Sequence, residues 1–306
     1  MLHVVMTNAL PVSGTGKIVR RQGFTLIELA IVLVIIGLLV GGVLVGRDLL
    51  SAAALRAQIS QIEKYQQAVN TFKGKYGYLP GDIPNPDATQ FGFMSRGIYT
   101  GEGDGDGLIL GISNHAAGNS WGNAESAGET VMLWADLGTA GLIDGRFNTA
   151  RPDSLPGANI TGTTLAAYLP SAKIARGNYI YAWSGGIAVG NNNAINYFGL
   201  SGTTNIASFG GMTSAPALTV LEAYTIDRKL DDGLPQSGNV IDLYLHNTNP
   251  DWAAGGGASG AWAGVATSAA ATTCHDNGNI TGAAHQYSIT QNNGAGMNCA
   301  LSFKFQ

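Results

Sequence analysis

The chain has 306 residues, which is enough for one large domain or two modest ones with a hydrophobic core of their own. Only 12% of the residues are charged and the net charge is −4, so no broad basic face is available and nucleic acid is not expected as a partner. Glycine is abundant, with 44 residues, a composition more typical of exported, loop-rich β proteins than of cytosolic enzymes.

The N-terminal region combines basic residues with a long apolar run. Arg20 and Arg21 precede the run, which extends from Phe24 to Val45 and is apolar except for Thr25 and Glu28. Its length is close to the ~20 residues that a helix needs to cross a bilayer. Positive charge ahead of the span predicts a leader in the cytoplasm and the rest of the chain across the membrane.

The expected cleavage point, between Gly23 and Phe24, lies in front of the apolar run. A secretory signal peptide, in contrast, is cut after its apolar stretch. The residues are Gly23-Phe24-Thr25-Leu26-Ile27-Glu28, and they resemble the class III signal of type IV pilins and type II secretion pseudopilins. The resemblance implies that a prepilin peptidase cuts after Gly23 and methylates the new amino group of Phe24. It also implies a single-pass inner-membrane protein with a periplasmic head, which then enters a pilus or pseudopilus.

Glu28 places a carboxylate inside the apolar span. Such a charge costs about 2.5 to 3.5 kcal/mol near the centre of a bilayer and less toward its edge, so a compensating partner is expected. The resemblance implies that this partner is the Phe24 ammonium of a neighbouring subunit, which makes Phe24 and Glu28 the expected assembly residues. The alternative is a carboxylate that reaches the cytoplasmic interface. Thr25 is interpreted as a tolerated small polar residue.

Beyond the span, apolar residues recur at helical spacing from Leu50 to Phe72, which predicts an amphipathic continuation of the same helix. Gly74, Gly77 and Pro80 are expected to end it. The predicted organisation is a leader at residues 1–23, a transmembrane and filament-core helix at 24–46, an amphipathic continuation at 47–78 and a head at 79–306.

The head contains helical and strand-like segments. Helical patterns occur at Glu125 to Gly145 and at Pro216 to Leu230. Strand-like runs occur at Tyr179 to Trp183, Gly186 to Val189, Ala194 to Phe198, Val240 to Leu245 and Cys299 to Phe305. A stretch rich in Gly, Ala, Ser and Thr from Ala253 to Thr273 predicts a surface loop. We therefore expect an α+β fold in which a long N-terminal helix packs on a β-rich, type IV pilin-like head.

Three short segments of the head are similar to segments of pilin-like proteins. They are Leu79 to Asp82, Trp134 to Ile143 and Lys229 to Pro235. They are less specific than the N-terminal signal, and they imply the head of a large pilin or pseudopilin. The like subunits and other pilins of a filament, the inner-membrane assembly platform and the prepilin peptidase are then the expected partners.

The chain has two cysteines, Cys274 and Cys299. In an oxidising compartment they could close a loop, which would stabilise the head by about 3 kcal/mol in the chain-entropy model. Two free thiols are an alternative. A zinc site is less favoured, because His275 is the only further ligand nearby. The pair also resembles the disulfide that bounds the C-terminal region of type IV pilins.

An acidic loop, GEGDGDGLILG, suggests a cation site. Its candidate ligands are the side chains of Glu102, Asp104 and Asp106 and the backbone carbonyl of Leu108. The alternate spacing matches the first half of an EF-hand loop, so Ca²⁺ is the expected cofactor. Ser113 occupies the position of the closing glutamate, and a ligand from elsewhere, such as Glu125 or Glu129, would be needed. A solvated acidic turn is the alternative.

A second acidic cluster consists of Asp227, Asp231 and Asp232. Like charges near a helix C-terminus are unfavourable, and a metal ion or Arg228 could offset them. A simple turn that ends the helix is the favoured interpretation.

Motifs of catalysis are missing from the sequence: there is no GxSxG elbow, HExxH pair or Walker loop. We therefore expect a structural subunit of a type IV pilus or type II secretion pseudopilus and not an enzyme. The alternative is a pilus-tip adhesin or DNA-uptake minor pilin whose head binds a ligand, for example through Trp252 and Trp262.

Overall fold

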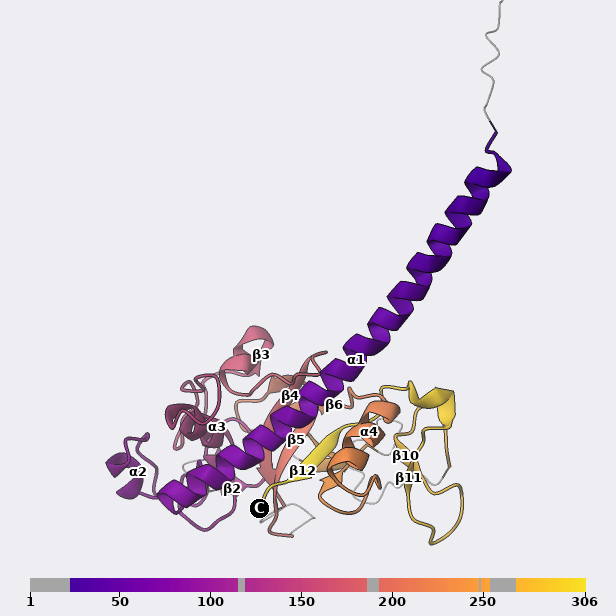
Figure 1. Ribbon diagram of the computed structural model, residues 1–306. Coiled ribbons are helices and arrows are strands. Elements are labelled where there is room, and N and C mark those ends of the chain that lie inside the picture. The colour runs from indigo at the N-terminus through magenta and orange to yellow at the C-terminus, as the bar shows by residue number, and fades with distance from the viewer. Residues whose placement is uncertain (1–22, 115–118, 186–192, 248, 254–267) are drawn as a thin grey trace, which may run out of the picture. The chain divides into compact units, whose positions relative to one another are not determined.

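The computed structural model describes residues 23–114, 119–185, 193–247, 249–253 and 268–306 (Figure 1). The chain divides into two compact units, Met1–Leu50 and Ser51–Gln306, and each is described by itself. The predicted strand Gly186 to Val189, most of the predicted loop Ala253 to Thr273, and Trp262 lie outside the described residues.

Helix α1 (Leu26–Tyr76) has 51 residues. This confirms that the apolar run and the amphipathic pattern after it form one helix. In the first unit the apolar side chains of residues 26–45 are exposed. Among the described residues, α1 is long and apolar enough to cross a membrane, with a mean hydropathy of 3.0 over its most apolar stretch. The helix continues through Gly74, which was expected to help end it, and ends before Gly77, whose φ of 82° is a left-handed conformation that favours glycine.

The second unit is built on a six-stranded antiparallel sheet. Its strands are β3 (Ile160–Thr161), β4 (Asn178–Ser184), β5 (Asn196–Ile206), β6 (Met212–Ala215), β7 (Val240–Ile241) and β12 (Leu301–Lys304). The long strand β5 pairs with β3, β4, β6 and β12, and β12 pairs in turn with β7.

The remaining elements surround this sheet. They are the strand pairs β1 (Gly111–Asn114) with β2 (Asn119–Trp121), β8 (Leu243–His246) with β9 (Asn249–Trp252) and β10 (His275–Asp276) with β11 (Gln286–Tyr287); the helices α2 (Asp87–Gln90), α3 (Glu129–Thr139) and α4 (Val220–Leu230); and the 3₁₀ helices η2 (Gly162–Ala167) and η3 (Gln291–Gly294).

One face of the sheet is covered by helices. Figure 1 shows the later turns of α1 lying over β5 and β12, and the ring of Tyr65 on α1 contacts that of Phe198 on β5, with centroids 6.2 Å apart. Trp134 on α3 packs against the same two rings, at 5.1 Å from Tyr65 and 5.6 Å from Phe198. All three side chains are buried, so the apolar stripe predicted for the amphipathic part of α1 supplies part of the core.

The other face is covered by β8 and β9. The hydroxyl of Tyr181 accepts a hydrogen bond from Leu245 N at 3.0 Å, and Trp183 Nε1 donates to Ser302 Oγ at 3.1 Å. Gly199 lies directly opposite Tyr181 in the β4–β5 register. A Cβ atom at Gly199 would lie 2.1 Å from the Tyr181 ring, so glycine is required beneath this ring.

Both predicted head helices begin later than their sequence patterns suggest. The segment predicted from Glu125 starts as α3 at Glu129, because Gly128 has a φ of 87° and Glu125 N bonds to Gly210 O, outside the helix. The segment predicted from Pro216 starts as α4 at Val220. Thr219 caps it, accepting from Glu222 N at 3.2 Å while Glu222 Oε2 accepts from Thr219 N at 2.9 Å.

Candidate functional site

The predicted processing residues lie directly ahead of the first helical residue, Leu26. Phe24 is 80% exposed, and a Cβ atom on Gly23 would meet no heavy atom within 4 Å. The bond between Gly23 and Phe24 therefore lies ahead of helix α1, in a segment without regular secondary structure.

Glu28 is hydrogen-bonded to Thr25, the residue that was interpreted as a tolerated small polar residue. The backbone N–H and the hydroxyl of Thr25 each donate to Glu28 Oε2 at 2.8 Å, and Glu28 N donates to Thr25 Oγ1 at 3.2 Å. These reciprocal bonds form a capping box, and the Thr-x-x-Glu spacing is its sequence signature. Thr25 is thus a helix cap, and it places the carboxylate at the positive end of the helix dipole.

The acidic loop is shaped by glycines in left-handed conformation. Gly101, Gly103, Gly105 and Gly107 have φ values of 81°, 99°, 80° and 87°. At Gly103 a Cβ atom would also lie 2.8 Å from the carbonyl oxygen of Ile83. The loop can therefore fold tightly onto the segment that follows α1 only with glycine at these positions.

The structure brings together a different set of carboxylates from the one predicted. Asp82, Asp104 and Asp106 have carboxylate oxygens that lie within 4.8 Å of one another. Asp82 Oδ1 accepts from Gly105 N at 2.6 Å, and Asp82 Oδ2 accepts from Gly107 N at 2.9 Å. Asp82 ends the Leu79 to Asp82 segment, but nothing in the spacing of the acidic loop itself points to it.

Glu102 is not in this group. Its Oε2 accepts hydrogen bonds from Ile98 N at 2.8 Å and from Tyr99 N at 3.1 Å, and the side chain is fully buried. The other predicted ligand residue, Leu108, donates its N–H to Asp106 Oδ1 at 2.7 Å. Asp104 and Asp106 therefore lie in one group with Asp82, while Glu102 binds the backbone of the preceding turn.

Glu129, the first residue of α3, supports the loop from within the core. Its Oε1 accepts from Gly103 N at 2.9 Å, and its Oε2 accepts from Leu110 N at 2.8 Å. Burial raises its pKa well above the usual value, and the nearby Asp82 raises it further. Burial also raises the pKa of Asp82, to about 7. Oxygen ligands of Ca²⁺, which lie about 2.3 to 2.6 Å from the ion, are at most about 5 Å apart, so the grouped carboxylates fit this ion.

Glu125, the other residue considered for closing the site, lies elsewhere in the core. It is fully buried, and neither carboxylate oxygen has a hydrogen-bond partner among the described residues. Burial raises its pKa well above the usual value.

The second acidic cluster forms a turn that ends α4. Asp227 accepts from Tyr287 Oη at 2.8 Å and from Gly233 N at 3.0 Å. Asp232 accepts from Leu234 N at 2.8 Å. These bonds use the carboxylates to bind the backbone after the helix, as the favoured interpretation predicted.

Cys274 and Cys299 form a disulfide with Cα atoms 5.0 Å apart. It ties the residue before β10 to the segment that leads into β12. Neither sulfur is free for zinc, which removes the alternatives of free thiols and of thiolate ligands.

Trp252, one of the two aromatic residues considered for ligand binding, packs edge-on against His275 with ring centroids 6.4 Å apart.

Comparison with known proteins places the N-terminal signal. Residues 18–44 match the family model of the prokaryotic N-terminal methylation motif. No curated protein and no solved structure matches the chain. The matched residues include the predicted cleavage point, Thr25, Glu28 and the first turns of α1. The chain therefore carries the methylation signal of type IV pilins and pseudopilins, which supports a processed, membrane-anchored subunit of that type.

Proposed function

We propose that the protein is a structural subunit of a type IV pilus or a type II secretion pseudopilus. A prepilin peptidase cuts it after Gly23, and it assembles through its N-terminal helix. The observation that carries this proposal is the methylation motif at residues 18–44, which runs directly into the apolar turns of α1. The head lies in the periplasm until the inner-membrane assembly platform adds the subunit to a filament.

In this proposal, assembly uses the negative charge of the Glu28 carboxylate, which also forms the capping box with Thr25. In the single subunit the Glu28 carboxylate binds Thr25. In a filament the apolar side chains of residues 26–45, which are exposed in the single chain, pack on neighbouring helices. Glu28 then also meets the ammonium group of a neighbour's Phe24, and each charge compensates the other in the apolar core.

The test is to follow the chain in cells that contain the prepilin peptidase and the assembly platform. We expect the chain in the sheared or pelleted filament fraction, with a mature N-terminus of N-methylated Phe24 by mass spectrometry. A chain that stays entirely in the membrane fraction although its leader has been removed would contradict assembly. A chain with an uncut leader would contradict the processing step itself.

We propose in addition that Asp82, Asp104 and Asp106 bind Ca²⁺ as a structural ion. Three carboxylates within 4.8 Å of one another repel unless protons or a cation compensate them, and oxygen ligands are those that Ca²⁺ prefers. The ion would tie the loop at residues 101–107 to the segment after α1. Thermal unfolding with calcium and with a chelator tests it.

A ligand-binding role at a pilus tip is not proposed as a second function. Its aromatic candidates were Trp252 and Trp262. Trp252 packs on His275, and Trp262 lies outside the described residues. Neither residue therefore favours a tip adhesin over a filament subunit.

A further inference from the structure

Two histidines lie next to each other on the hairpin that the disulfide anchors. In the β10–β11 pair, His275 lies directly opposite Tyr287. His285 lies directly before β11, two residues from Tyr287. The imidazole rings of His275 and His285 meet, with centroids 5.1 Å apart and ring planes inclined at 51°.

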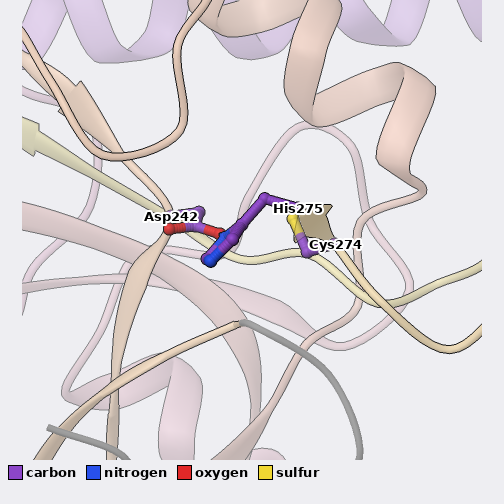
Figure 2. A group of neighbouring side chains, drawn as sticks. All are labelled: Asp242, Cys274 and His275. Atoms are coloured by element: carbon purple, nitrogen blue, oxygen red, sulfur yellow. The ribbon is translucent and has the colours of Figure 1, made fainter. Parts of the chain in front are cut away.

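His275 is oriented by a buried carboxylate. Its Nδ1 contacts Asp242 Oδ2, and both side chains are fully buried (Figure 2). Asp242 comes from the junction between β7 and β8, so the contact joins the hairpin to the main sheet. This leaves Nε2 as the second ring nitrogen, and Nε2 lies 3.4 Å from Gln236 Nε2. A histidine whose other nitrogen binds a carboxylate is the usual arrangement of a metal-ligating histidine.

His285 supplies the second imidazole and lines a pocket that is open to solvent. Its Nδ1 is buried and has no hydrogen-bond partner among the described residues. The side chain lines a surface pocket of about 390 Å³, together with Gln236, Ser237 and Asn277. Burial and the neighbouring His275 lower the pKa of His285.

The distance between the rings fits one ion between them. With metal–nitrogen bonds of about 2.0 to 2.1 Å and a tetrahedral angle, two imidazoles on a zinc ion have centroids about 5 Å apart. We propose that His275 Nε2 and a ring nitrogen of His285 bind a divalent transition-metal ion of the zinc class. Water from the pocket completes the coordination in place of the Gln236 amide nitrogen that contacts His275 Nε2.

The neighbouring residues restrict the ligand set. The sulfur of Cys274 lies beside the His275–Asp242 pair (Figure 2), but it belongs to the disulfide and offers no thiolate. Asp242 acts through His275 and is therefore a positioning residue. Two imidazoles favour zinc, copper or nickel over calcium, which distinguishes this site from the acidic loop.

The test uses the untagged, oxidised full-length chain in detergent, stripped of metal by a chelator and titrated with Zn²⁺ by calorimetry at pH 7.5. We expect one ion per chain and loss of that binding in His285→Gln. His246→Gln is the matched control, because His246 lies on β8, where its Nδ1 contacts Ser214 O at 2.7 Å. Asp242→Asn should weaken binding about tenfold, as expected for an outer-shell carboxylate. Circular dichroism checks that each variant folds.

A measurement on the unaltered chain gives an independent answer. On addition of Zn²⁺, the imidazole NMR signals of His275 and His285 should shift together, while those of His246 stay in place. Absence of zinc binding by the folded chain would overturn the proposal. So would binding that survives His285→Gln with unchanged affinity, or signals of His246 that shift while those of the pair do not.

Discussion

The hydroxyl and the backbone N–H of Thr25 both donate to Glu28 Oε2, each at 2.8 Å. The carboxylate that is expected to pair between subunits therefore already has a local role, because it caps its own helix. The two roles differ in what they need from the side chain. Capping needs an oxygen acceptor, which glutamine also provides, whereas pairing with an ammonium group in an apolar core needs the negative charge.

Substitutions at Glu28 separate these two roles. Glu28→Gln and Glu28→Ala should both insert, be processed and fold, yet both should fail to assemble, because an unpaired Phe24 ammonium in the filament core costs about 3 to 5 kcal/mol. Thr25→Ala is the control. It should weaken the helix end by about 0.5 to 2 kcal/mol but still give filaments. Quantification of filaments by immunoblot of the sheared fraction provides the measurement. Wild-type filament levels with Glu28→Gln would show that capping, and not charge, is what assembly requires.

We expect processing to depend on the small residue at the predicted cleavage point. Gly23→Leu should leave the leader uncut and the protein in the inner membrane, because the signal resembles those that require a small residue at this position. Gly37→Leu is a suitable control, since Gly37 lies within α1 and a Cβ atom there would meet no heavy atom within 4 Å. Mass spectrometry of the N-terminus decides the outcome. A Gly23→Leu chain that still begins with methylated Phe24 would contradict the assignment of the signal.

The fold was predictable where local pattern and burial agree. The apolar run and the apolar stripe that follows it predicted α1, because both are helical patterns. The first is typical of a helix within a membrane and the second of a helix that packs on a protein core. Strand β5 was predicted only as far as Phe198, yet it continues to Ile206. Its second half, Gly199 to Ile206, is rich in Gly, Ser, Thr and Asn, and it forms a strand by pairing with β3, β4 and β6. Strand propensity within the segment does not reveal these long-range pairings.

The acidic site also depends on tertiary contacts that the local sequence pattern does not contain. The spacing of Asp104 and Asp106 marked the loop, but Asp82 joins them through tertiary structure, across more than 20 residues of chain. Glu102 fits the spacing equally well and is nevertheless turned onto Ile98 and Tyr99. Thr25, by contrast, could have been recognised, because the capping-box signature is present in the sequence.

Calcium should stabilise the head through the grouped carboxylates. At a calcium concentration of 100 times Kd, a site present only in the folded state adds about 2.7 kcal/mol to the free energy of unfolding. The double variant Asp104→Asn, Asp106→Asn should lose this gain and should be no less stable than wild type in chelator, because two like charges have been removed. Asp153→Asn, at an exposed position outside the group, should keep the gain. Thermal unfolding by circular dichroism measures all three, and identical wild-type melts with calcium and with chelator would leave only a solvated acidic turn.

The raised pKa of Asp227 predicts how the stability of the head changes with pH. Its side chain is fully buried, and burial raises its pKa to about 7, against the hydrogen bonds from Tyr287 and Gly233. In the unfolded chain an aspartate has a pKa of about 3.9. Between these two values the folded state binds the proton and the unfolded state does not. The free energy of unfolding therefore falls as pH rises from about 4 to about 7, with a slope of up to about 1.4 kcal/mol per pH unit from this one group.

The variant Asp227→Asn isolates this contribution, because other buried carboxylates such as Asp242 change their charge in a similar range. Asparagine keeps an oxygen that can accept from Tyr287 or Gly233 but does not ionise. We expect the stability of Asp227→Asn relative to wild type to increase between pH 4.5 and pH 7.5, as the wild type acquires the buried charge that the variant lacks. Asp153→Asn should show no such trend. Denaturant unfolding at a series of pH values in chelator gives the difference at each point. A difference that is constant over this range would mean that Asp227 keeps the same protonation state throughout, and that the bonds from Tyr287 and Gly233 hold the carboxylate in its charged form despite its burial.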